Sequence, residues 1–243
     1  MQQAEEKSGG LTGNVLKWIA IVSMVIDHIG FVLIETNYDE KGTFLERLPW
    51  SKEQILFADS ILREIGRLAF PIFCFLLVQG AIYTRNRKKY ALRLFLFSLI
   101  SEVPFDLACY KTPFSIDGQN VFFTLFIGLL AICALDYWKE HSIKAWGMVA
   151  VLAVLAQILR TDYGAGGVLL IVLFWVFRFE ELRRNIVGAI WEVIGIGVQE
   201  AAAMFAFIPI HFYNGKRGKG NKYVFYVFYP VHLLILVWIR SLL

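Results

Sequence analysis

Charge is scarce in this sequence. Only 18% of its 243 residues are charged, whereas 58% belong to the hydrophobic set, and the apolar residues come in long runs. In a soluble domain, the solvent-facing side of a helix carries regularly spaced charged residues. The long apolar runs of this sequence lack such residues. The composition therefore excludes an ordinary soluble domain and predicts an integral membrane protein. Because the runs are continuous and do not alternate with a period of two, they indicate a helical bundle and argue against a β-barrel.

Several catalytic and metal-binding motifs are also missing. The sequence has no HExxH, GxSxG or GxxxxGK[ST] pattern, so a zinc protease, a serine hydrolase and a P-loop lack support, and no metal is predicted. The three cysteines, Cys74, Cys109 and Cys133, lie in or beside apolar runs without CxxC spacing. They are predicted to be buried thiols. The net charge of +4 is concentrated in loops, which indicates membrane orientation and not nucleic-acid binding.

The sequence contains apolar runs that define one transmembrane domain, residues 14–243, after a polar tail, residues 1–13, that does not resemble a cleaved signal peptide. We expect an all-α, polytopic membrane bundle of about eight transmembrane helices. The runs cover residues 15–35, 61–83, 90–110, 121–138, 145–159, 168–179, 186–212 and 223–239. Polar residues and a proline interrupt the run 186–212, so it fits either one tilted helix or two short ones. The interrupting residues are Glu192, Gln199, Glu200 and Pro209.

Basic clusters between the runs predict the topology. Loops on the cytoplasmic side of a membrane carry an excess of Lys and Arg, so the loops around residues 85–89 and 178–184 are predicted to be cytoplasmic. The loop 213–222 is equally basic. Its side depends on whether the run 186–212 crosses the membrane once or turns back, and the sequence leaves both arrangements open.

The first apolar run contains two ionisable residues, Asp27 and His28. Such groups are costly in hydrocarbon unless they face a partner or a water-filled cavity, so they indicate a functional site. A carboxylate beside a neutral imidazole raises its basicity, which would allow His28 to take a proton from an amine or hydroxyl. The alternative is that Asp27 only pairs with an arginine of another helix and that His28 is an interior histidine with its hydrogen bonds satisfied.

A second pair of acidic residues, Glu102 and Asp106, is spaced four residues apart and therefore shares one helix face, with Pro104 between them. Two interpretations fit this pair. The residues could lie at a helix end that is solvated at the interface, or they could line a cavity that binds a cationic group or pairs with Arg67.

Long strings distributed over residues 16–236 resemble the TraX family of bacterial membrane proteins. These strings are LKWIAIVSMVIDHIG, GRLAFPIFCFLLVQG, YALRLFLFSLISEVPFDL, QNVFFTLFIGLL, DYGAGGVLLI, YNGKRG and KYVFYVFYPVHLLIL. The resemblance implies a role in conjugative-pilus biogenesis, in which the family's namesake acetylates the amino terminus of pilin. The family is also similar, more distantly, to polytopic acyltransferases that use acyl-CoA.

The resemblance implies roles for individual residues. It makes His28 a general base with Asp27 beside it, and it places the donor phosphates on basic side chains. The resemblance makes Arg85, Arg87, Lys88, Lys89 and Arg93 candidates for the donor phosphates, and Tyr229 and His232 match a motif of the terminal helix. The family's loop signature contains Asn214, Lys216 and Arg217, without an assigned role. Arg67, Glu102, Asp106 and Asn120 are added as polar groups within or lining the apolar segments. The predicted cofactor-binding set is Arg67, Arg85, Arg87, Lys88, Lys89, Arg93, Lys216 and Arg217, and the predicted substrate-binding set is Glu102, Asp106, Asn120, Asn214, Tyr229 and His232.

The expected function is that of a membrane acetyltransferase in the bacterial cytoplasmic (inner) membrane, which the chain would cross several times. Acetyl-CoA would be the acyl donor, and the acceptor would be an amine or hydroxyl of pilin or of an envelope glycan or peptide. Membrane lipids are the other expected partners, and no nucleic acid is expected. A non-enzymatic transporter, a pilus or envelope assembly component, and a structural scaffold remain open as alternatives.

Overall fold

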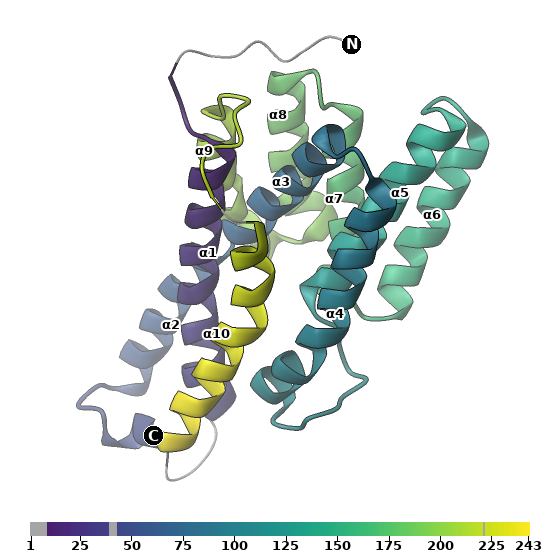
Figure 1. Ribbon diagram of the computed structural model, residues 1–243. Coiled ribbons are helices and arrows are strands. Elements are labelled where there is room, and N and C mark those ends of the chain that lie inside the picture. The colour runs from purple at the N-terminus through teal and green to yellow at the C-terminus, as the bar shows by residue number, and fades with distance from the viewer. Residues whose placement is uncertain (1–8, 39–42, 221) are drawn as a thin grey trace.

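The computed structural model describes residues 9–38, 43–220 and 222–243, and every regular element in these ranges is helical (Figure 1). Residues 1–8 of the expected polar tail lie outside the described residues. The elements are α1 (Gly13–Ile29), η1 (Gly30–Ile34), η2 (Glu35–Asn37), η3 (Phe44–Arg47), α2 (Lys52–Gly66), α3 (Ala69–Tyr83), α4 (Arg87–Tyr110), α5 (Val121–Trp138), α6 (Ile143–Ile158), α7 (Gly164–Val176), α8 (Glu181–Trp191), η4 (Glu192–Ile196), η5 (Val198–Ala206), α9 (Phe207–His211) and α10 (Lys222–Leu242). The predicted helical fold is confirmed.

Short polar residues set where the helices begin. Thr12, Asn86, Asn120 and Ser142 each accept a hydrogen bond from a backbone N–H in the first turn of α1, α4, α5 and α6, respectively. Ser51 forms a capping box with Gln54 at the start of α2. These side chains satisfy donors that a helix start otherwise leaves free. The apolar runs therefore start as helices at positions that the sequence itself marks.

Helix α5 occupies the centre of the bundle, in contact with α3, α4, α6 and α7. Small residues permit the closest approaches. A Cβ added at Gly128 of α5 would overlap the side chain of Ile171 in α7, and one added at Gly167 would lie 2.7 Å from Cζ of Phe70 and 2.7 Å from Cβ of Tyr163. Close packing through small residues is the main means by which helices associate in a membrane, because lipid tails remove the hydrophobic driving force.

The run 186–212 forms two short arms joined by a turn. Helix α8 leads the chain away from one end of the bundle. The segments η4 and η5 then reverse the chain direction, and α9 returns to the end at which α8 begins (Figure 1). His211 Nδ1 in α9 lies 3.0 Å from Glu181 Oε1 in the first turn of α8, which fixes both ends of this hairpin together. Of the two arrangements that the sequence left open, the structure has the one that turns back. Residues 213–220 therefore lie at the same end as the basic segments 85–89 and 178–184, which we call the basic end.

Four helical stretches of the described chain are long and apolar enough to cross a membrane: Gly13–Asn37, Lys52–Tyr83, Val121–Trp138 and Val224–Leu242. Helices α6 and α7 are apolar but shorter, and α4 carries four cations and two carboxylates among its 24 residues. The expected number of about eight crossings is not confirmed by length and composition. A membrane protein of several apolar helices is what the structure supports, and its exterior carries many large apolar side chains.

Candidate functional site

Two histidines from opposite ends of the chain meet inside the bundle. His28 comes from the last turn of α1 and His232 from the middle of α10, and their nitrogens Nδ1 and Nε2 are 2.6 Å apart. His232 Nδ1 lies 2.9 Å from the carbonyl oxygen of Phe228, which can only accept. A neutral His232 therefore donates from Nδ1 and accepts at Nε2 from Nδ1–H of His28. This chain of hydrogen bonds leaves the lone pair on Nε2 of His28.

Aromatic rings surround the histidine pair and fix its geometry. The ring of His232 stacks on that of Phe228 at a centroid distance of 5.0 Å, and Tyr229 contacts both imidazoles edge-on. His232 is 5% exposed, whereas His28 is only half-buried. His28 is therefore the more exposed of the two histidines, whereas His232 and Tyr229, which were predicted to bind substrate, are both buried.

The carboxylate of Asp27 has a different partner from the imidazole beside it. Its Oδ2 is 2.6 Å from Arg63 of α2, and Arg63 Nε lies 3.0 Å from Glu35. The structure thus shows Asp27 in an ion pair with an arginine of another helix, while the partner of His28 is His232. The sequence analysis expected Asp27 to assist His28, but the direct hydrogen-bond partner of His28 is a second histidine, His232.

One turn further along α2, Arg67 forms an ion pair with Glu200 of η5. Arg63 and Arg67 are four residues apart and share one face of the helix, so the five residues form a central ion-pair cluster. Its members are Asp27, Glu35, Arg63, Arg67 and Glu200. The sequence analysis missed Arg63. Its spacing of four residues from Arg67, at the start of an apolar run, was the available signal.

The close approach of α1 and α2 at this cluster depends on Gly66, because a methyl group there would overlap Cβ and the carboxyl group of Asp27. We expect Gly66→Ala to destabilise the fold by about 1–3 kcal/mol, since overpacking moves neighbouring side chains. Thermal unfolding in detergent measures the effect. The matched control is Gly147→Ala in α6, where an added Cβ meets nothing within 4 Å and helix propensity favours alanine. Equal unfolding temperatures for the two variants would contradict this account.

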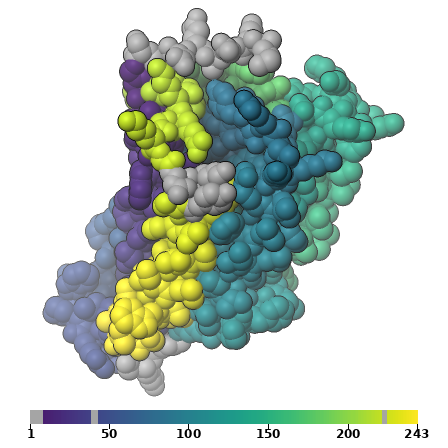
Figure 2. All heavy atoms as spheres, in the orientation of Figure 1, coloured from purple at the N-terminus to yellow at the C-terminus, as the bar shows by residue number. Residues whose placement is uncertain are grey.

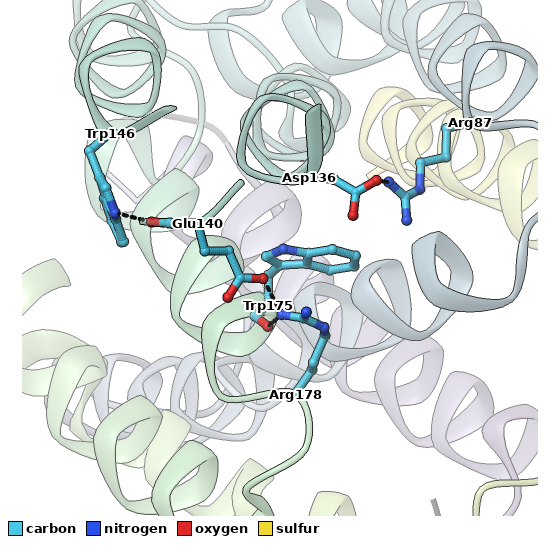
Figure 3. A network of polar contacts seen from close by, with 6 residues as sticks. All are labelled: Arg87, Asp136, Glu140, Trp146, Trp175 and Arg178. Carbon is cyan, nitrogen blue, oxygen red and sulfur yellow. Dashed lines mark hydrogen bonds and ion pairs between the residues drawn. The ribbon is translucent and has the colours of Figure 1, made fainter. Parts of the chain in front are cut away.

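At the basic end, a polar network joins α4, α5 and α7 (Figure 3). Arg87 donates to Asp136 at 2.6 Å, Arg178 donates to Glu140 at 2.6 Å, and both guanidinium groups lie against the indole of Trp175. Arg87, which the resemblance assigned to a donor phosphate, is therefore held within the protein. The other predicted phosphate ligands of this segment, Arg85, Lys88 and Lys89, are exposed.

Three of the predicted substrate residues hold the connection between α4 and α5. Asn120 donates to Glu102 and, at 2.8 Å, to the carbonyl oxygen of Ser98, while Asp106 accepts from the backbone N–H of Ser115 at 2.8 Å. Neither acidic residue pairs with Arg67, whose partner is Glu200. Through these contacts, Glu102, Asp106 and Asn120 stabilise the connection between α4 and α5.

The loop signature YNGKRG holds the start of α1. Asn214 donates its backbone N–H to Leu11 at 2.9 Å, and its side chain accepts from the N–H of Lys216 at 3.0 Å. The carbonyl oxygens of Lys216 and Arg217 accept from the N–H groups of residues 13 and 14. The loop thereby brings Arg217 beside Lys17, and both residues line a cavity with Arg93. The sequence analysis missed Lys17, although it is a cation within an apolar run.

No group of three or more His, Cys, Asp or Glu side chains that could hold a metal ion occurs in the part of the chain that the structure describes. The three cysteines form no disulfide with one another, and Cys74 is buried. The chemistry available to the described site is therefore that of the histidine pair and the ion-pair cluster.

Glu192, in the turn between α8 and α9 and outside the four apolar stretches, is fully buried, and both its carboxylate oxygens lack a hydrogen-bond partner among the described residues. Burial, together with nearby Glu200, raises the pKa of Glu192 to about 8. Because the folded state holds this proton more tightly than the unfolded state, the residue's contribution to stability falls as the pH rises from about 4.5 through 8.

We therefore expect Glu192→Gln to unfold at a higher temperature than the parent at pH 9, with a much smaller difference at pH 5. Thermal unfolding at the two pH values measures this change. The exposed Glu64 supplies the control, since Glu64→Gln should shift the unfolding temperature equally at both. A difference for Glu192→Gln that does not grow with pH would rule out a buried, protonated carboxyl group.

These features define a helical membrane protein with one basic end and an interior that holds charged and histidine side chains. The sequence matches the family model of the TraX protein over residues 12–240, and the chain belongs to the TraX family. The resemblance noted in the sequence is confirmed. A curated relative, the probable fimbrial assembly protein FimC of serogroup H1 from Dichelobacter nodosus, is 28% identical over 247 residues, which cover 91% of this chain and 92% of that protein. No solved structure matches the chain.

Proposed function

We propose that this protein is a membrane component of pilus or fimbria assembly. The observation that carries the proposal is the likeness to the fimbrial assembly protein, which extends over 91% of this chain and 92% of that protein. We place the protein in a bacterial cytoplasmic membrane, crossed several times. The basic end would face the cytoplasm, in agreement with the distribution of positive charge.

Deletion of the gene in a host that makes fimbriae tests this proposal. We expect surface fimbriae to be lost, with the fimbrial subunit still synthesised, and to return when the chain is supplied on a plasmid. Electron microscopy of the cells and immunoblotting of sheared surface protein give the two readouts. Normal numbers of fimbriae in the deletion strain would contradict the proposal.

A second candidate function is acyl transfer, and the lone pair on Nε2 of His28 favours it. In this reaction the acceptor amine or hydroxyl attacks the thioester carbonyl of acetyl-CoA, and Nε2 of His28 takes the acceptor proton. The new amide or ester bond forms as the C–S bond breaks, and the thiolate of CoA leaves. His28 then carries a positive charge that its hydrogen bond to His232 and the carboxylate of neighbouring Asp27 would stabilise.

Arg67 would assist this reaction from the central ion-pair cluster. Its Nε is buried without a hydrogen-bond partner among the described residues, so it is a free donor for charge that develops on the thioester oxygen. The purified chain is given acetyl-CoA labelled in the acetyl group, with a fimbrial subunit or a cell-envelope extract as acceptor. Label in the acceptor above a protein-free blank would support acyl transfer, and label that stays in acetyl-CoA with every acceptor would exclude it.

A further inference from the structure

A cavity of about 320 Å³ lies near the basic end, between α1, α3, α4 and α10. Three cations line it, Lys17 from α1, Arg93 from α4 and Arg217 from the loop before α10, and none of its described lining residues is an Asp or Glu. Arg93 Nε is buried and has no hydrogen-bond partner among the described residues. Positive groups without a carboxylate partner, gathered around a cavity, are complementary to an anion.

The rest of the lining is apolar and aromatic. It includes Phe73, Leu76, Leu77, Leu94, Leu125 and Phe225. A free inorganic anion would make no favourable contact with these apolar side chains. An anion attached to a hydrocarbon chain would contact both the cations and the apolar lining. The lining therefore favours an amphiphile with a negatively charged head.

The positions of Lys17 and Arg93 along their helices agree with a membrane lipid. Lys17 is the fifth residue of α1 and Arg93 the seventh of α4, so at 1.5 Å per residue they lie roughly 6–9 Å from the helix starts. The headgroup layer of one leaflet is about 5–8 Å thick. With the two helix starts at the membrane surface, Lys17 and Arg93 lie near the boundary between headgroups and hydrocarbon, where a phospholipid carries its phosphate.

The helices beside the cavity have apolar outer faces. Leu92 and Leu96 of α4 are 55% and 47% exposed, and Val224 and Val227 of α10 are 47% and 48% exposed. Helices α4 and α10 are in contact and lie side by side on the face drawn in Figure 2. An acyl chain in the bilayer would already touch these faces, so a lipid could enter the cavity sideways.

We propose that this cavity binds an anionic phospholipid of the membrane, with its phosphate held by Lys17, Arg93 and Arg217 and its acyl chain on the apolar lining. This inference does not depend on the proposed function. The site would bind lipid whether or not the histidine pair transfers an acyl group.

Native mass spectrometry of the purified full chain in detergent tests the proposal. The probes are phosphatidylglycerol, phosphatidylcholine, an acyl-CoA and inorganic phosphate, each titrated separately. We expect phosphatidylglycerol to bind at least tenfold more tightly than phosphatidylcholine. Stronger binding of acyl-CoA or of inorganic phosphate than of phosphatidylglycerol would overturn the lipid assignment, as would equal binding of the two lipids.

Charge-removing variants locate the site. Each of Lys17→Gln, Arg93→Gln and Arg217→Gln should weaken phosphatidylglycerol binding about tenfold, the effect of losing one hydrogen bond to a charged group. Arg217 lies in an exposed loop, so Arg217→Gln tests the proposal even if the substitutions within helices impair folding. The matched control is the triple variant Arg85→Gln, Lys139→Gln and Lys144→Gln, which removes three exposed charges outside the cavity. Equal losses in the control and the Arg217 variant would refute the site.

Discussion

Replacement of Arg63 by methionine is expected to lower the free energy of unfolding by about 3 kcal/mol or more. The substitution keeps a long apolar stem but removes the charge that pairs with both Asp27 and Glu35. Removing one partner of a largely buried ion pair leaves an uncompensated charge, which costs more than the pair contributes when it is intact. Chemical or thermal unfolding in detergent micelles measures the loss.

The reason for this loss can be tested by removing the second charge as well. Arg63→Met combined with Asp27→Asn should recover much of the lost stability, because the buried carboxylate that lacked a partner is then neutral. Arg47→Met, at an exposed position, is the control and should change little. A double variant that is no more stable than Arg63→Met alone would mean that Arg63 acts by packing and not by charge.

If His28 is the base of the proposed acyl transfer, its replacement by asparagine is expected to reduce that transfer by about 10²- to 10⁴-fold, the usual contribution of a general base. The asparagine amide can still donate to Nε2 of His232, as Nδ1–H of His28 does, but it offers no lone pair at the Nε2 position. The variant therefore separates the base from the hydrogen bond. The turnover of labelled acetyl-CoA is the measurement, and the unfolding temperature should stay close to that of the parent.

Two further variants decide how the result is interpreted. His141→Asn, at an exposed position at the basic end, is the matched control and should retain full turnover. His232→Gln should lower turnover less than His28→Asn does and shift its pH profile, because His232 acts by positioning the ring of His28. Unchanged turnover in His28→Asn would remove this residue from the reaction. Full support of fimbria assembly by the same variant would show that assembly needs no base there.

Much of the fold could be predicted from the sequence because its causes are local. Apolar runs longer than a bilayer core, ended by polar residues, specify helices directly. The caps Thr12 and Asn120 stand in the sequence where the helices begin. The number of crossings was harder to predict. Whether the run 186–212 turns back depends on tertiary contacts, such as the one between Glu181 and His211, that no local pattern shows.

The candidate site was only partly predictable for the same reason. An ionisable group within an apolar run is a recognisable signal, and Asp27 and His28 were found in this way, whereas His232 was noted through the family resemblance. The partner that each one selects is a property of the packed bundle. Sequence neighbours Asp27 and His28 point to different partners, Arg63 on α2 and His232 on α10. Lys17 was overlooked because its role emerges only where the loop before α10 folds back over α1.

The two imidazoles that touch are separated by 204 positions in the chain. During synthesis α1 reaches the bilayer among the first helices, whereas α10 follows every other helix described here. A nascent or truncated chain that lacks α10 therefore contains one histidine without the other, and Nδ1 of His28 then has no His232 to orient it. The contact between the two rings therefore cannot form until the last helix has been made, and this part of the interior is among the last to be completed.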